Sequence, residues 1–169
     1  MGLLGFLFIT SASVVLGIQR SVEKRRQVEQ LGSLIAMLNT ISCEITSHRT
    51  PLNEIFRHIS QNADNNIRGF ADYISSELKN DTRNNFYEYW AFGTENFLSY
   101  LSAEAKEAFL RLGSFLGRYD AVLQSDAISR CISDLEHEYI LKKDKQRDNE
   151  RLCIALWGSA GMIISLILI

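Results

Sequence analysis

The feature that most constrains this fold is a pair of uncharged stretches near the two ends of the sequence. Residues 2–19 (GLLGFLFITSASVVLGIQ) and residues 152–169 (LCIALWGSAGMIISLILI) contain no charged side chain. With a rise of about 1.5 Å per residue, either stretch forms a helix of about 27 Å, close to the ~30 Å hydrocarbon core of a bilayer. The pattern predicts transmembrane helices at 2–19 and 152–169, with residues 20–151 as a domain between them.

Each stretch also has a second interpretation. The first could be a signal peptide, but no basic residue precedes it and it runs into Gln19 and Arg20 rather than a small-residue cleavage site. The last could be a buried core helix, but it is apolar on every face and leaves no polar stripe for water. Two membrane spans remain the preferred interpretation.

The basic residues predict the orientation of the chain. Nine of the eighteen lie just inside the two spans and none lies outside them: Arg20, Lys24, Arg25, Arg26, Lys142, Lys143, Lys145, Arg147 and Arg151. Basic residues close to a span are retained in the cytoplasm, so we expect a cytoplasmic domain with both termini outside. The same side chains suit anionic lipid headgroups at the membrane surface.

The middle of the domain has the opposite charge. Residues 31–141 contain nine basic and fifteen acidic residues, a net charge of −6, and no basic stripe that would indicate nucleic-acid binding. The three cysteines form no C-x-x-C pair, so neither a disulfide framework nor a zinc site is indicated. We expect Cys43 and Cys131 to be buried free thiols on apolar helix faces.

Helical periodicity covers the domain, and the single proline marks a break in it. The first long helix has an apolar face at Leu31, Leu34, Ile35, Leu38, Ile41 and Ile45. Proline pushes the residue before it into extended geometry, so Thr50 is expected as the N-cap of the next helix and Pro51 as its first residue, followed by Leu52.

The remaining helices are separated by polar turns at 61–66 and 80–85. Ser102 is a suitable N-cap for one helix, Gly117 a suitable stop for it, and Asp120 a suitable cap for the last long helix. No strand or internal repeat is indicated. The sequence therefore predicts an all-α bundle of about six helices, whose first and last helices are antiparallel neighbours that continue into the membrane spans.

Nothing in the sequence indicates an active site. There is no phosphate-binding loop, no H-E-x-x-H and no nucleophile elbow, so we expect no enzyme activity, no cofactor, no metal and no small-molecule substrate. In the aromatic segment 86–92, Tyr87 and Phe92 point away from the core face and are candidates for a partner surface. Small residues could pack the spans against each other or against other subunits: Ser13, Gly17, Ala155, Gly158, Ser159 and Gly161.

These features together resemble the stage III sporulation protein AB family of endospore-forming bacteria. The resemblance rests on the two-span layout, RRQVEQLGSLIAMLNTISCEI (25–45) with TPLNEIF (50–56) shortly after it, FYEYW (86–90), LGRYD (116–120) followed by Gln124, and the ending GSAGMIISLILI. It implies a non-enzymatic membrane component of the channel complex between mother cell and forespore. That family is similar to the F-type platform proteins of type II secretion, which sit beside a hexameric cytoplasmic ATPase.

The resemblance thus implies two kinds of partner, a cytoplasmic secretion-type ATPase and other membrane components of the same complex. The alternative function is a membrane-tethered helical signalling or regulatory module with no part in secretion.

Overall fold

The computed structural model describes the backbone of residues 2–48, 50–80 and 85–167, and the side chains of residues 22–48, 50–80 and 85–145. These residues form helices and no strand, which confirms the predicted all-α bundle for the described part of the chain. The elements are α1 (Gly2–Cys43), the π-helical turn η1 (Glu44–His48), α2 (Leu52–Asn62), α3 (Arg68–Asn80), α4 (Phe86–Phe97), α5 (Ala103–Gly113) and α6 (Ala121–Ile167).

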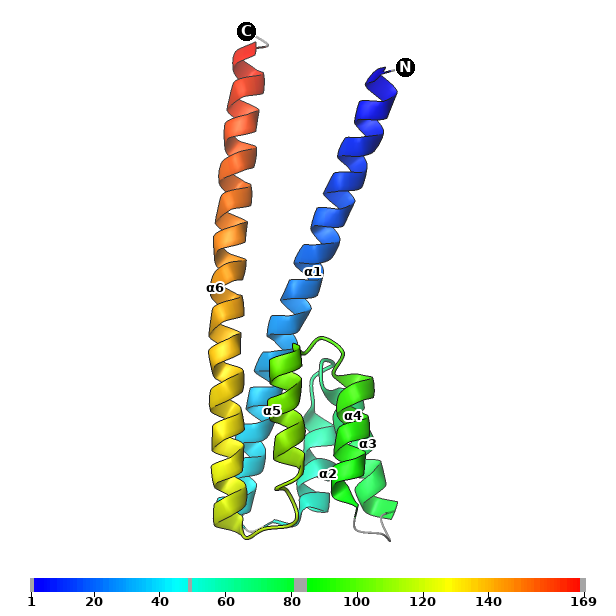
Figure 1. Cartoon of the computed structure of the whole chain (residues 1–169), viewed down its shortest axis with the longest axis vertical. Helices are drawn as coiled ribbons and strands as arrows, with labels where there is room; N and C mark the ends of the chain where they lie inside the picture. Colours follow the sequence, from blue (N-terminus) through cyan, green and yellow to red (C-terminus); the bar gives the residue numbers. More distant parts are fainter. Residues whose placement is uncertain (1, 49, 81–84, 168–169) are drawn as a thin grey trace.

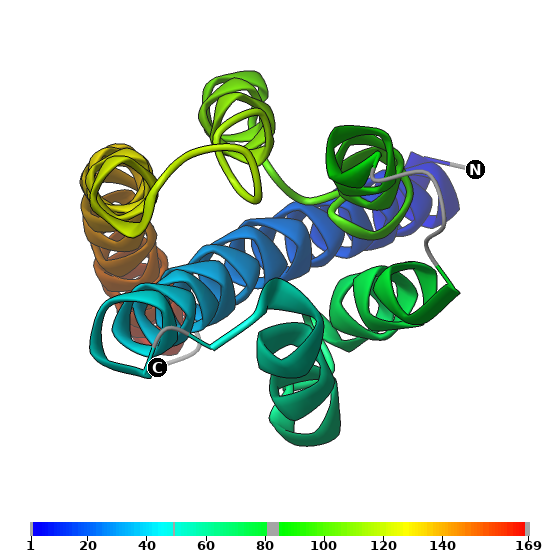
Figure 2. The same ribbon diagram turned by 90° about the horizontal axis from the view of Figure 1, so that it is seen from below.

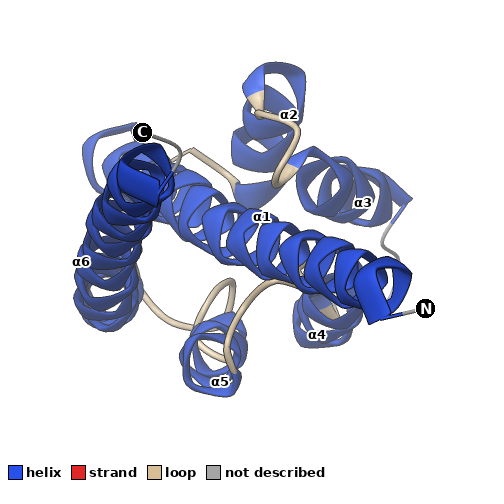
Figure 3. Cartoon of the chain, turned by 90° about the horizontal axis from the view of Figure 1, so that it is seen from above, coloured by secondary structure: helices blue, strands red, loops and turns tan. Residues whose placement is uncertain are grey.

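Two long helices set the shape of the molecule. α1 has 42 residues and α6 has 47, and both extend beyond the short helices in the same direction, so the two chain ends lie at the same end of the molecule (Figure 1). Views along the long axis show α2 to α6 arranged around α1 (Figures 2 and 3). α1 and α6 pack against each other, as predicted for antiparallel neighbours.

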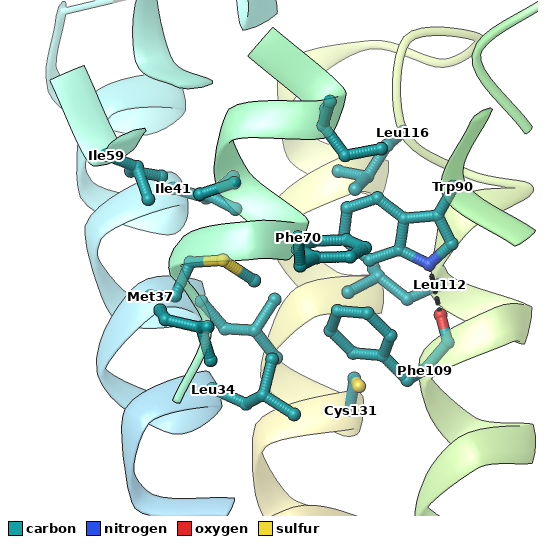
Figure 4. Close-up of a cluster of buried hydrophobic side chains, with 14 of the residues drawn as sticks. Leu34, Met37, Ile41, Ile59, Phe70, Trp90, Phe109, Leu112, Leu116 and Cys131 are labelled. Atoms are coloured by element: carbon teal, nitrogen blue, oxygen red, sulfur yellow. Dashed lines mark hydrogen bonds between the residues drawn. The ribbon is translucent and has the colours of Figure 1, made fainter. Parts of the chain in front are cut away.

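The core is built from the apolar stripe of α1 and a set of aromatic rings. Leu31, Leu34, Leu38 and Ile41 are completely buried, as their spacing on one helix face requires. Trp90 lies at the centre of the rings, stacked on Phe109 with ring centroids 4.4 Å apart. Its indole N–H donates to the carbonyl of Phe109 at 2.7 Å (Figure 4), so this buried polar atom is satisfied.

A buried glutamine connects α1 to two loops. The side-chain amide of Gln30, 2% exposed, donates to the carbonyl of Asn66 at 3.0 Å and, more weakly, to that of Phe97 at 3.5 Å. Its carbonyl oxygen accepts from the backbone N–H of Tyr100 at 3.1 Å. Gln30 therefore satisfies backbone groups in the α2–α3 and α4–α5 connections, which secondary structure alone leaves unpaired.

The break near Pro51 differs in detail from the prediction. Pro51, not Thr50, is the N-cap of α2: it has φ −62° and ψ 144°, and its carbonyl accepts from Glu54 and Ile55 at 3.0 and 3.1 Å. The Thr50 hydroxyl instead donates to the Glu44 carboxylate at 2.7 Å. The prediction was wrong by one residue because this contact with the end of the preceding helix takes the hydroxyl away from the amides of α2.

The two predicted spans are helical along the backbone at residues 2–19 and 152–167, as parts of α1 and α6. Their side chains lie outside the described residues, and so do Ser13, Gly17, Ala155, Gly158, Ser159 and Gly161, the small residues predicted to pack them. In the part of the chain described with its side chains, no helix has an apolar stretch long enough to cross a membrane.

Candidate partner-binding surfaces

A groove of about 630 Å³ lies at the end of the bundle opposite the chain ends and is called here the distal groove. It is lined by Ile45 of η1, by residues 50–52, by Gly117 and Asp120 of the α5–α6 loop, and by residues 121, 122 and 124 in the first turn of α6. Two stretches that are distant in sequence, 45–52 and 117–124, thus meet at one surface.

Local sequence explains how the wall of this groove forms. Asp120 caps α6, since its carboxylate accepts from the backbone N–H of Leu123 at 2.9 Å, as predicted from sequence. Gly117 has a φ of 76°, a left-handed conformation that favours glycine. It lies four residues beyond the end of α5, however, because the helix stops at Gly113 rather than continuing to 116 as expected.

Large apolar side chains are exposed at this end of the bundle. Val122, which lines the distal groove, is 69% exposed, and Tyr119 in the adjoining loop is 50% exposed. Leu123 and Phe115, 48% and 37% exposed, line a separate pocket between α5 and α6. A group of this kind on one end of a molecule is typical of a protein interaction site. The sequence analysis did not predict this exposed apolar group, because helical periodicity assigns core positions in α6 only from Ile128 onward. The apolar pair at 122 and 123 has no place in that core, and it was the signal that could have indicated the surface.

The two aromatic residues predicted for a partner surface are both exposed. Tyr87 is 43% and Phe92 is 54% exposed. Five positions separate them on α4, a rotation of about 140° around the helix, so they belong to different faces. Phe92 packs against Tyr73 of α3, with ring centroids 5.2 Å apart. Tyr87 takes part in none of the ring contacts between the described residues.

The basic residues predicted to flank the membrane lie at the end of the bundle nearest the chain ends, where many have partners. Arg26 donates to the hydroxyl of Tyr100 at 2.7 Å, with its guanidinium 5.6 Å from the ring centroid. Lys142 donates to Gln27 at 2.9 Å, which joins α6 to α1. Arg25 pairs with Glu29 at 2.9 Å, and Lys143 donates to the Tyr139 hydroxyl at 3.2 Å.

Lys24 and Lys145, the other two of these residues whose side chains are described, are exposed. The side chains of Arg20, Arg147 and Arg151 lie outside the described residues.

The two thiols whose side chains are described, Cys43 and Cys131, give no sign of chemistry. Burial, together with the nearby Asp134 carboxylate, raises the pKa of Cys131 to about 12, so it remains a protonated, unreactive thiol at neutral pH. Cys43, expected to be buried, is exposed because it lies about 200° around the helix from Ile41 and so points away from the apolar stripe. No group of three or more His, Cys, Asp or Glu side chains that could hold a metal ion occurs among the described residues.

Comparison with known proteins places the whole chain in one group. The family model for stage III sporulation protein AB matches residues 2–169. Stage III sporulation protein AB of Bacillus subtilis (strain 168) is 26% identical over 176 aligned residues, covering 98% of each chain. A solved structure of stage III sporulation protein AB superposes with a TM-score of 0.66 at 19% identity, covering 73% of this chain and 98% of that one.

Proposed function

The chain belongs to the stage III sporulation protein AB family, a family of sporulation proteins, and from this premise we propose that it is a platform of a mother cell–forespore channel complex. In this proposal the protein is non-enzymatic, spans the mother-cell membrane facing the forespore with residues 2–19 and 152–169, and holds its helical domain in the cytoplasm. The domain docks a cytoplasmic secretion-type ATPase.

The observation that carries the proposal is the polarity of the molecule. Both long helices leave the bundle at one end (Figure 1), and the described basic residues of the predicted membrane flanks lie at that same end. The distal groove and its exposed apolar rim lie at the other end. Residues 22–43 of α1 separate the two ends by about 33 Å of helix, enough to present a docking surface well clear of headgroups.

The distal groove suits the ATPase better than the other surfaces of the domain. A site for a large soluble partner must be accessible after the domain is anchored, which favours the end farthest from the membrane. Its exposed Val122 can be buried by a partner at a gain of roughly 25 cal/mol per Å² of apolar surface. Thr50, Asp120 and Gln124 add polar side chains to the lining of the groove, which could orient a partner.

The first test is topology. Single cysteines at exposed Asn65 in the α2–α3 loop and at Asn84, in a background with the three native cysteines removed, are probed with a membrane-impermeant thiol reagent in intact and in lysed cells. Protection until lysis is expected. Labelling in intact cells would place the domain outside, where no cytoplasmic ATPase could reach it, and the proposal would fail.

The second test is ATPase binding by the full chain in neutral detergent micelles. Val122→Asp places a charge on the rim of the distal groove and is expected to weaken binding at least tenfold. Tyr87→Asp, a similar change at an exposed position on α4, is the matched control and should leave binding unchanged. Failure of the unaltered chain to bind the ATPase in any nucleotide state would instead favour a membrane-tethered regulatory module.

A further inference from the structure

A second surface of the domain has a different chemistry from the distal groove. Tyr73 of α3 and Phe92 and Phe97 of α4 form a continuous row of rings, called here the aromatic strip. The Tyr73 ring centroid lies 5.2 Å from that of Phe92 and 5.6 Å from that of Phe97. Phe92 is 54% and Phe97 39% exposed, whereas Tyr73 is partly buried against the core, so the two phenylalanine rings are presented to solvent.

Two glycines hold the strip in place. A methyl group at Gly69 would lie 2.8 Å from Cδ1 of Phe97, and one at Gly93 would lie 3.2 Å from Cδ1 of Tyr73. Glycine inside a helix costs roughly 0.5–1 kcal/mol relative to alanine, and α3 and α4 each accept that cost where a ring lies against the backbone. Phe97 and Tyr73 are therefore packed against the helix backbone, and a partner would find this part of the surface already ordered.

Unpaired carboxylates accompany the strip. Glu77 lies one helical turn after Tyr73 on α3, and Glu88 lies one turn before Phe92 on α4, so each shares a face with a ring of the strip. Burial and, to a lesser degree, the charge of Glu77 raise the pKa of Tyr73, as a carboxylate one helical turn away would do. Among the described residues neither Glu77 nor Glu88 forms an ion pair, whereas Glu95 is neutralised by Lys106 at 2.6 Å.

We propose that the aromatic strip docks an arginine-bearing segment of another protein of the complex. A guanidinium group stacks on an exposed ring and pairs with a carboxylate at the same time, and Glu77 and Glu88 place carboxylates beside the rings. An anionic membrane surface does not fit, since the same carboxylates would be repelled by it.

Arg25 and Arg26 of this chain are engaged with Glu29 and Tyr100. A second copy remains the competing occupant, because its exposed Arg57, Arg118 and Arg130 form no ion pair among the described residues, and the cross-linking experiment below separates the two. The proposal goes beyond ATPase docking, since it concerns a different face of the domain and does not require the distal groove.

A peptide titration tests the chemistry directly. The full chain in neutral detergent micelles is titrated with a fluorescent peptide of alternating arginine and glycine, and with a control peptide carrying glutamate in place of arginine. Phe92→Ala and the double variant Glu77→Gln/Glu88→Gln should each bind the arginine peptide roughly three- to tenfold more weakly, the size of one or two lost cation–aromatic or ion-pair contacts. Tyr87→Ala, exposed on another face of α4, should bind like the unaltered chain.

The proposal is wrong if Phe92→Ala and Tyr87→Ala bind the arginine peptide equally, or if the glutamate peptide binds as well as the arginine peptide. Because Phe92 is largely exposed, its truncation should leave the fold intact, which circular dichroism checks.

Cross-linking in sporulating cells tests the occupant. A photoreactive amino acid at position 92, with position 87 as control, is activated and the linked peptide is sequenced. An adduct with an arginine-bearing segment of a different protein supports the proposal. An adduct with a second copy of this chain, an adduct with lipid, or no adduct at position 92 overturns it. Val122→Asp should leave this adduct unchanged, so a failure of ATPase docking and a failure of the aromatic strip give different results.

Discussion

Gly113, the last residue of α5, lies directly against the indole ring of Trp90. A methyl group on its Cα would be 2.3 Å from Cδ1 of Trp90 and 2.6 Å from Cγ, far inside any normal contact. We predict that Gly113→Ala destabilises the domain, because the clash is with a ring at the centre of the core rather than with the end of a flexible side chain.

The size of the expected loss of stability follows from the contacts that hold the Trp90 ring in place. Trp90 is completely buried, stacks on Phe109 at 4.4 Å, makes an edge contact with Phe70 at 5.2 Å, and donates its N–H to the Phe109 carbonyl. Overpacking a well-packed core costs about 1–3 kcal/mol, and loss of the hydrogen bond adds about 1 kcal/mol. The better helix propensity of alanine returns at most about 1 kcal/mol, so the net expectation is a loss of about 1–3 kcal/mol.

Gly32→Ala is the matched control. Gly32 lies inside α1, and its methyl group would be 3.5 Å from Cε2 of Tyr139, an ordinary van der Waals distance. The same chemical change should there stabilise the domain by roughly 0.5–1 kcal/mol, through helix propensity and a less flexible unfolded chain.

The assay is urea unfolding of the full chain in neutral detergent, followed by the fluorescence of Trp90. Trp157→Phe removes the second of the two tryptophans, so the signal reports the core alone. The two alanine variants should shift the unfolding midpoint in opposite directions. If Gly113→Ala proves as stable as the unaltered chain, or if both variants shift alike, then Trp90 can move at no cost and the account of the core given above is refuted.

Three further predictions use the same unfolding assay and thiol chemistry. Gln30→Leu should lower the free energy of unfolding by about 1–3 kcal/mol, because it leaves backbone groups of two loops buried without partners; an unchanged midpoint would contradict this. Ser102→Ala should cost about 1 kcal/mol, since the hydroxyl caps α5 and also donates to Glu138 at 2.7 Å. The pKa of Cys131 is about 12 in the folded state against about 9 unfolded, so folding keeps the proton on. The stability that this provides is complete below pH 9 and should be lost as pH rises toward 12. The Cys131→Ser variant should show no such loss. Near neutral pH, a thiol reagent should label exposed Cys43 well before Cys131.

The regular parts of the fold could be predicted because they depend on local pattern. The apolar stripe of α1, the caps at Ser102 and Asp120 and the polar turn at 61–66 are each specified by residues within one or two turns of helix. The exposed position of Cys43 could also have been predicted, since a rotation of 100° per residue from Ile41 already turns Cys43 away from the core.

Other features depend on contacts between distant segments and could not be predicted from local pattern. α5 ends at Gly113 rather than near residue 117. At Gly113 the chain passes the ring of Trp90, a residue more than twenty positions earlier in the sequence. The cap of α2 moved to Pro51 because Thr50 binds Glu44 across the break. The distal groove joins residues 45 to 124, and the aromatic strip joins α3 to α4, so each candidate surface appears only once the helices are packed.

The position of the distal groove has a mechanical consequence for the proposed platform role. Its walls include Ile45, just after α1, and the first turn of α6, which are the far ends of the two helices that lead to the chain ends. A partner in this groove therefore contacts α6 directly and reaches α1 through η1, the turn that continues it. Those helices are held together along the bundle by buried core residues and, near the predicted membrane surface, by the bond from Lys142 to Gln27. A force applied at the groove would thus reach both predicted spans together, because changing the angle between α1 and α6 would first require the core between them to open.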